Sequence, residues 1–411
     1  MKESVPRLRK DIELIPTYYK GARGVLIRDS LGLIKEPIFL KGELLGLVSL
    51  IDGESTIRDI QIELMRQKSG DFISSDEVKS LLSELDSVFI LDSENYRQQK
   101  DRMISEYSLL EVREACHVGR SYPQAPEELR VYLDSFFHHE EDSEEGLEDK
   151  NIIALISPHI DLETGRRVYT KAYLTIKNST PKRIVLFGTG HNLHESFLAL
   201  TEKDFETPFG RVMTDKDFVR ELKSAGDGAV SPYDIVHRSE HSLEFQLIFL
   251  QHIFGSGFSL IPFLCGSFHK VLEEVLRPSD IPGVDSFLKV LSDFIKDHAS
   301  DTLLVAGVDF SHIGPKFGHS ERASSMLLET KNHDKVLIDA ICRGKIEDFW
   351  TETREVKDRY NVCGFSAIAC LLEIIKETQG QLLGYDIWQE EPTQSAVSFA
   401  AIAFEKKDAS K

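Results

Sequence analysis

The sequence predicts a layered α/β fold with a mostly parallel central sheet, and two observations carry this prediction. Two continuous apolar runs, 152–156 and 183–188, are stopped by Pro or Gly shortly after they end, which is typical of strands buried on both faces of a parallel sheet. Beyond residue 150, predicted strands alternate with predicted helices, as expected where crossover helices connect parallel strands.

Composition limits the class of protein. With 411 residues the chain exceeds one typical domain, so we expect two. No apolar run reaches the roughly 20 residues that span a bilayer, and the N-terminus lacks an apolar signal core. These features predict a cytoplasmic protein with no membrane partner. The net charge of -19 argues against nucleic acid as a partner. The five cysteines lack CxxC spacing, which favours reduced thiols.

Residues 1–95 are predicted to form a small α+β domain. Strands at 24–29 and 34–40 suggest a hairpin, helices are expected at 57–68 and 74–85, and 89–91 supplies a closing strand. This order resembles a winged-helix domain and also the small peptide-binding or partner-docking domains that accompany peptide-modifying enzymes. A packing or dimerisation module is the alternative. DNA binding is the least favoured role, because no helix is dense in Lys and Arg.

The remaining chain divides into a polar, helix-prone connector at 96–110, an α/β domain at 111–405 and a tail at 406–411. An acidic run containing His138 and His139 is interpreted as a solvated loop in preference to a metal site. The elements expected in the α/β domain cover residues 125–137, 152–156, 166–176, 183–188, 214–224, 241–252, 259–265, 286–298, 302–308, 364–378 and 396–404.

Reactive side chains follow three of the predicted strands. His159 comes just after the first, His191 after the second, and Asp309 with His312 after the run at 302–308. In open α/β sheets, ligands bind at the carboxyl ends of the strands. The sequence therefore predicts a polar, imidazole-rich pocket at this edge.

Two predicted helix starts add further candidates. Glu240 and His241 open one helix, and Cys363 opens another, where the helix N-terminus can lower the pKa of a thiol. Each residue has a plain structural alternative: a hydrogen-bonding loop histidine, a buried cysteine, a turn-capping aspartate, or, for Glu240 and Glu244, an ordinary pair on a helix surface. Only their co-occurrence favours a metal or acid–base site.

Eight short motifs occur in the order seen in the Memo family, also called AmmeMemoRadiSam system protein B. This family resembles class III extradiol dioxygenases in fold, and the resemblance covers residues 111–405. The motifs are Arg113-Glu-Ala-Cys-His117-Val-Gly-Arg-Ser-Tyr122, Ser157-Pro-His159, Gly188-Thr-Gly-His191, Glu206-Thr-Pro-Phe-Gly210, Glu240-His-Ser-Leu-Glu244, Asp309-Phe-Ser-His312-Ile-Gly314, Cys363-Gly364 and Ser395-Ala-Val-Ser-Phe399.

The resemblance implies one mononuclear metal centre. The family's metal-binding histidines fall on His159 and His191, and its metal-binding cysteine falls on Cys363. These donors suit iron or copper, and zinc accepts the same set. In the related dioxygenases the third ligand is a carboxylate, so the cysteine weakens any direct transfer of ring-cleaving activity. No residues that bind an organic cofactor are predicted.

Four other residues, which we expect to be catalytic, fall on other pocket positions of the family. His312, oriented by Asp309, is expected to relay a proton, while His241 and Glu240 position the ligand. The chain departs from the family's usual pattern in having Ile160-Asp161-Leu162 where many members have Ala-Gly-Tyr, and Asn192 where many have a second histidine. These changes concern substrate contacts more than metal ligands.

The expected function is a redox or dioxygenase-type activity on an unknown small-molecule substrate. Two alternatives stay open. One is a non-catalytic docking module with a radical S-adenosylmethionine protein as its partner, favoured by the acidic surface and the added N-terminal domain. The other is a zinc-dependent hydrolase that uses metal-bound water.

Overall fold

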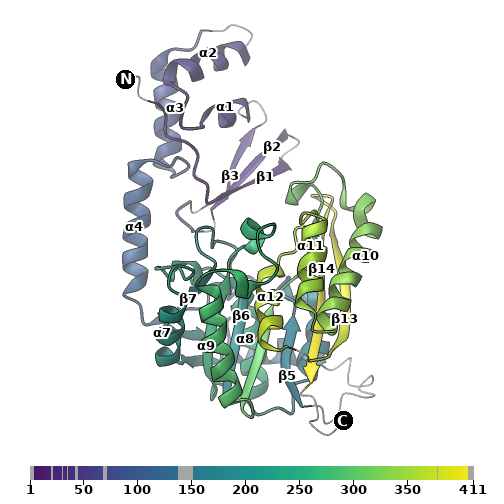
Figure 1. Ribbon diagram of the computed structural model, residues 1–411. Coiled ribbons are helices and arrows are strands. Elements are labelled where there is room, and N and C mark those ends of the chain that lie inside the picture. The colour runs from purple at the N-terminus through teal and green to yellow at the C-terminus, as the bar shows by residue number, and fades with distance from the viewer. Residues whose placement is uncertain are drawn as a thin grey trace. The chain divides into compact units, whose positions relative to one another are not determined.

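Figure 1 shows the computed structural model of the chain, which separates into two compact units, Met1–Leu109 and Leu110–Lys411. We call them the first and the second unit. No helix among the described residues is long and apolar enough to cross a membrane. His138 and His139 lie outside the described part of the chain. The described residues are 4–19, 22–29, 31–34, 36–41, 45–67, 72–137, 151–376 and 378–405.

The first unit combines a three-stranded antiparallel sheet, in the order β1-β2-β3, with helices that follow it in the chain. The predicted hairpin is confirmed, since β2 pairs with β3. Ser74 caps α3 and forms a capping box with Glu77, which satisfies amide groups at the start of the helix. The elements are β1 Ile12–Tyr19, β2 Ala22–Asp29, β3 Ile38–Lys41, α1 Leu45–Leu50, α2 Ile57–Gln67, α3 Ser75–Ser87 and α4 Glu94–Ser108.

The closing strand expected at 89–91 is wrong. Phe89 has a φ of 58°, and its amide donates to Asp86 while the Ile90 amide donates to Leu85. These bonds terminate α3 in the way typical of a left-handed helix cap, so the amides are not available for a sheet. Only Leu91 forms an isolated bridge, to Leu8. Most of the expected connector at 96–110 lies in α4, within the first unit.

A mixed α/β architecture with a large, mostly parallel central sheet is confirmed for the second unit. The sheet order is β12-β14-β5-β11-β6-β10-β9-β8-β4, with β13 beside β14 and β7 beside β10. The pairs among β5, β11, β6 and β10 are parallel, and β12, β13 and β14 add antiparallel pairs at one side. The strands are β4 Val112–Arg113, β5 Ile152–Ser157, β6 Arg183–Thr189, β7 Leu198–Leu200, β8 Asp204–Thr207, β9 Gly210–Thr214, β10 Ser259–Cys265, β11 Thr302–Gly307, β12 His312–Ile313, β13 Gly380–Glu390 and β14 Ser395–Glu405.

The helices of the second unit form two groups. Helices α5, α6 and α8 contact one another, and α7, α9, α12, α11 and α10 form a chain of contacts in which each packs against the next. Helices α10 and α11 and strand β13 are not among the elements predicted from sequence. The helices are α5 Pro126–Phe137, α6 Leu162–Leu174, α7 Lys216–Ala225, α8 His241–Phe254, α9 Val284–Asp297, α10 Ala323–Cys342, α11 Ile346–Glu355 and α12 Phe365–Ile374.

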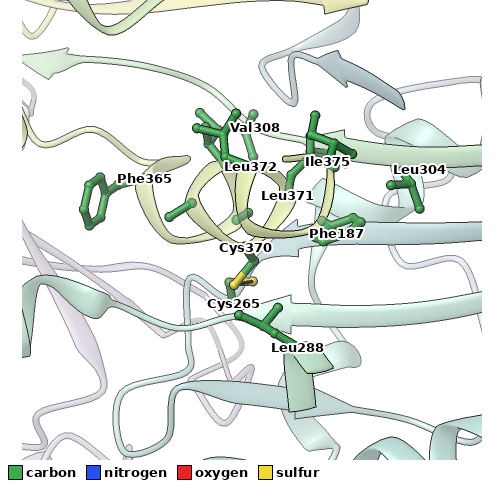
Figure 2. Packing of buried hydrophobic residues seen from close by; sticks show 14 of the residues in the cluster. Phe187, Cys265, Leu288, Leu304, Val308, Phe365, Cys370, Leu371, Leu372 and Ile375 are labelled. Atoms are coloured by element: carbon green, nitrogen blue, oxygen red, sulfur yellow. Dashed lines mark hydrogen bonds between the residues drawn. The ribbon is translucent and has the colours of Figure 1, made fainter. Parts of the chain in front are cut away.

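A large hydrophobic core fixes α12 to the central sheet. Phe187 of β6 and Cys265 of β10 pack with Cys370 of α12 in this core (Figure 2). The two sulfur atoms lie 3.9 Å apart and both side chains are buried, so these thiols serve as small apolar core groups. Because α12 is almost entirely buried, the residues just before its first turn are held at a fixed place on the sheet.

Candidate metal centre

Three neighbouring parallel strands deliver polar side chains to one edge of the sheet. Strand β11 lies between β5 and β6 and pairs with both. His159, Asp309 and His191 are each the second residue after β5, β11 and β6 respectively. Since parallel strands end at the same edge, the order of the strands sets the order of these side chains there.

Backbone hydrogen bonds hold Cys363 against the segment that follows β11. The Cys363 amide donates to the carbonyl of Phe310 at 3.1 Å, and the Gly364 amide donates to that of Asp309 at 2.9 Å. A Cβ atom at Gly364 would lie 2.6 Å from Val308 Cβ and 2.8 Å from the Asp309 carbonyl oxygen. Glycine is therefore required at this position for the close approach of α12 to β11.

The thiol of Cys363 meets two imidazoles. Its Sγ lies 3.3 Å from Nε2 of His159 and 3.5 Å from Nε2 of His191. The two rings are 5.0 Å apart between centroids and nearly perpendicular. The three donor atoms therefore converge on one point, as ligands of a single ion would.

When no metal is bound, the thiolate of Cys363 and the protonated imidazoles of His159 and His191 stabilise one another electrostatically. Burial opposes ionisation of Cys363, but the two imidazoles outweigh it and hold the pKa of the thiol well below its usual range. Burial likewise opposes protonation of His159, yet Asp309 and Cys363 raise the pKa of its imidazole to about 9. The protons on the imidazoles thus occupy the position where a metal cation would balance the thiolate.

Each imidazole is oriented by a hydrogen bond at its other nitrogen. His159 Nδ1 lies 2.9 Å from the carbonyl oxygen of Gly307, and His191 Nδ1 lies 3.0 Å from Glu240 Oε1. A carbonyl or carboxylate oxygen can only accept, so Nδ1 carries the proton in both rings. When the rings are neutral, both Nε2 lone pairs face Cys363, which is the arrangement that metal binding requires.

Glu240 and His241 lie beside the two imidazoles. Glu240 is 2% exposed and caps α8 by accepting a hydrogen bond from the Ser242 amide, and its Oε1 is 3.3 Å from His241 Nδ1. The His241 ring stacks on His191 at 4.8 Å. Burial lowers the pKa of His241 well below its usual value, so this imidazole is neutral.

Among the described residues, the hydrogen bonds of Asp309 and His312 go to other partners than to each other. Asp309 accepts a hydrogen bond from the His159 amide at 3.0 Å, and its second oxygen lies 3.6 Å from His159 Nε2. The His312 imidazole instead places Nδ1 3.0 Å from the carbonyl oxygen of Phe310. The main chain therefore orients His312, while the buried Asp309 carboxylate is engaged with His159.

Comparison with known proteins decides the family. The model of the Memo family, described as Memo-like protein, matches residues 113–403. The chain belongs to the Memo family. All eight sequence motifs lie within or at the border of this match.

Relatives occur in bacteria and archaea. A MEMO1 family protein of Aquifex aeolicus is 29% identical over 388 residues, covering 92% of this chain and 95% of its own. A Thermus thermophilus relative is 27% identical and covers 83% of this chain and 97% of its own, and one from Nitrosopumilus maritimus is 24% identical, with coverages of 71% and 99%. The Aquifex match exceeds the length of the second unit, so it extends into the first unit.

Among solved structures, that of an uncharacterized protein from Escherichia coli K12 is similar to part of this chain. It is 11% identical and covers 62% of this chain and 99% of its own, with a TM-score of 0.36. At this level the likeness supports no conclusion about fold or function.

A buried network near the centre was not predicted from sequence. Glu244 is fully buried, and its carboxylate contacts the Arg113 guanidinium, which is also buried. It further accepts hydrogen bonds from the amides of Cys116 and His117 and from the hydroxyl of Tyr122. The alternative of an exposed Glu240 and Glu244 pair is therefore wrong, because both side chains point into the protein. The Memo motif at 113–122 was the only available signal.

Proposed function

We propose that the second unit of this Memo family member holds a single metal ion through His159, His191 and Cys363 and supports a redox or dioxygenase-type reaction. The observation that carries this proposal is the convergence of Sγ and two Nε2 atoms within 3.5 Å, with both Nδ1 atoms already engaged elsewhere. Donor atoms that converge on one point, with the other ring nitrogens hydrogen-bonded elsewhere, are the expected form of a metal site.

The donor chemistry favours iron or copper as the ion. Two imidazoles and one thiolate suit iron and copper, and zinc accepts the same donors. Bound iron or copper would supply one-electron chemistry and polarise a substrate oxygen. We extend the proposal to a class III extradiol dioxygenase-like arrangement of the second unit, with Cys363 where the third, carboxylate ligand stands in those enzymes.

His312 is proposed to move a proton at the same edge of the sheet. Its Nδ1 faces the Phe310 carbonyl oxygen at 3.0 Å, so the neutral ring keeps its proton on Nδ1 and leaves Nε2 as the basic atom. The ring is partly exposed, which lets a substrate reach that atom. Asp309 acts on His159 instead, by accepting its amide hydrogen and keeping the loop after β5 in place.

Glu240 and His241 are proposed to shape the binding pocket. Glu240 fixes the proton of His191 on Nδ1, which directs Nε2 toward the metal position. His241 covers one face of His191 as a neutral ring and is itself partly exposed. A small molecule that binds beside His191 would contact this imidazole.

The test is elemental analysis of protein purified anaerobically without a metal-affinity column, comparing wild type with Cys363→Ala. Near-stoichiometric iron or copper that disappears in the variant is the expected result, and oxygen uptake with phenols and thiols would then be screened. Metal content that is equal in the two proteins would contradict the assignment. Activity restored by zinc and insensitive to oxygen and reductant would favour the hydrolase alternative.

The first unit supports a second proposal, that of a cytoplasmic docking module for a peptide or protein partner such as a radical S-adenosylmethionine protein. It has its own buried core, which includes Ile27, Ile60 and Ile90, and the Aquifex relative extends into it. We propose that residues 1–95 form a winged-helix-like domain and that this domain docks the partner. Affinity capture from native lysate with the full chain, and with a chain lacking residues 1–95, tests the proposal. Equal recovery of partners by the two would contradict it.

A further inference from the structure

A ladder of hydrogen bonds joins two segments that come from different parts of the chain. We call residues 357–364 the Cys363 turn and residues 309–317 the His312 segment. Three backbone hydrogen bonds connect the two segments. The donors are the amides of Cys363, Gly364 and His312, which reach the carbonyl oxygens of Phe310 at 3.1 Å, Asp309 at 2.9 Å and Tyr360 at 2.7 Å.

Asn361 adds a side-chain bond to this ladder. Its Nδ2 donates to the carbonyl oxygens of His312 and Phe317, both at 3.1 Å. Its φ is 47°, a left-handed conformation that few residues other than glycine adopt, although asparagine tolerates it. Glycine would adopt this backbone more easily but has no amide group. The position therefore combines a glycine-like backbone with a double hydrogen-bond donor.

The preceding residues show that the turn is held under constraint. Lys357 and Asp358 also have positive φ values, of 52° and 48°. The Asp358 carboxylate accepts a hydrogen bond from the Val362 amide at 3.0 Å, and its other oxygen lies 2.9 Å from His269 Nε2. Unusual backbone conformations persist only where their surroundings over-determine them, and they cluster at functional sites.

We propose that Asn361 is a positioning residue that sets the Cys363 thiol against His159 and His191. It acts through the backbone, by tying the Cys363 turn to the His312 segment, and the inference rests on the metal centre proposed above. Its loss should leave all three ligands present but misplace Sγ. The expected consequence is weaker metal binding, since partners outside the ligand set typically contribute about 10–100-fold to metal affinity.

The test is a titration of the metal-free full chain with Co²⁺, followed by the absorption of the thiolate–cobalt bond. Asn361→Asp keeps a residue type that tolerates the left-handed backbone but points a carboxylate at two carbonyl oxygens. We expect its dissociation constant for Co²⁺ to rise about 10–100-fold. Asn361→Gly loses the two hydrogen bonds without this repulsion, and we expect a rise of about threefold to tenfold.

A matched control exists in the same unit. Gln394 also has a left-handed backbone, with a φ of 54°, and lies in the turn between β13 and β14. Gln394→Asp should bind Co²⁺ as the wild type does. If Asn361→Asp does not fold, as judged by circular dichroism, Asn361→Gly carries the comparison alone.

Hydrogen exchange of the metal-free protein gives a second readout that needs no metal. Both Asn361 variants should exchange the amides of Cys363 and Gly364 faster than the wild type, because these amides belong to the ladder. Affinity equal to wild type in both variants would overturn the positioning role. Weaker binding with unchanged exchange would overturn it too, since the ladder would then be held without Asn361.

The metal centre and the positioning role fail in distinguishable ways. If the wild type does not bind Co²⁺, the proposed metal centre is wrong, whatever the Asn361 variants do. The same conclusion follows if the wild type and Cys363→Ala bind Co²⁺ with equal affinity. If the wild type binds Co²⁺ through Cys363 and both Asn361 variants bind it with normal affinity, only the positioning role of Asn361 is wrong.

Discussion

Two groups of three side chains each bring a thiol together with other potential metal ligands, but they differ in how their atoms are used. In the proposed metal centre, Cys363 Sγ lies 3.3 and 3.5 Å from the Nε2 atoms of His159 and His191. In the buried network, Cys116, His117 and Glu244 likewise place a thiol, an imidazole and a carboxylate within 4.8 Å of one another. Residue type alone would not separate the two.

The difference lies in the hydrogen-bond partners. The Glu244 carboxylate already receives the Arg113 guanidinium, two amides and the hydroxyl of Tyr122. Burial opposes its ionisation, but Arg113 and these donors lower the pKa of Glu244 to about 2. The Arg113 guanidinium thus supplies the positive charge that a metal cation would otherwise supply to Glu244. We infer that the network is structural and that ion binding belongs to the group whose donor atoms face one another.

The largest expected effect comes from breaking the buried network. Glu244→Gln leaves the Arg113 guanidinium buried without its countercharge, so we expect the second unit to lose about 3–5 kcal/mol of unfolding free energy. Chemical denaturation followed by tryptophan fluorescence measures this loss, since both tryptophans lie in the second unit. Asp339→Asn, at an exposed ion pair with Arg343 in the second unit, is the control and should change stability by no more than about 0.5 kcal/mol.

Replacing each of the two cysteines by alanine tests the comparison directly. Cys363→Ala should weaken metal binding by a factor on the order of 100 or more, because even residues outside the ligand set contribute about 10–100-fold. Cys116→Ala removes the same atoms from the buried network and should retain wild-type affinity. Isothermal titration with Co²⁺ measures both. Equal losses in the two variants would mean that the networks do not differ in function.

The two groups should also respond differently to pH. The pKa of His159 in the metal-free protein is raised to about 9, so below that pH a proton must leave before the metal binds. Affinity should fall as pH decreases, by about tenfold per pH unit for each proton released, which is about 100-fold per proton between pH 8 and pH 6. Titrations in buffers of different ionisation enthalpy count the protons. The contribution of Glu244 to stability should stay constant above pH 4.5 and be lost as pH falls toward its folded pKa of about 2.

A smaller effect is expected where a carboxylate only orients a ligand. Glu240→Gln keeps an oxygen that can accept from His191 Nδ1 but removes its charge, so we expect about tenfold weaker metal binding. A matched substitution at an exposed acidic residue, Glu163→Gln, should have no effect on affinity. Affinity unchanged by Glu240→Gln would show that the hydrogen bond to His191 is dispensable.

Local patterns in the sequence were enough for the strands and for the residues that follow them. The strands β5, β6 and β11 were visible as apolar runs, because a strand buried on both faces needs apolar residues at every position. Each observed strand ends one residue before or after the predicted end, so His159, His191 and Asp309 follow the strands as predicted. The order of the motifs similarly indicated the Memo family before any comparison.

Tertiary structure alone decided which polar atoms meet. Asp309 accepts a hydrogen bond from the amide of His159, 150 residues away in the chain, because β5 and β11 are adjacent in the sheet. Glu244 is buried against Arg113, a partner that lies 131 residues before it in the chain. Helical periodicity and spacing carry no information about such pairs. Hydrogen bonds between distant segments form only once the strand order is set, and they distinguish the proposed metal centre from the network beside it.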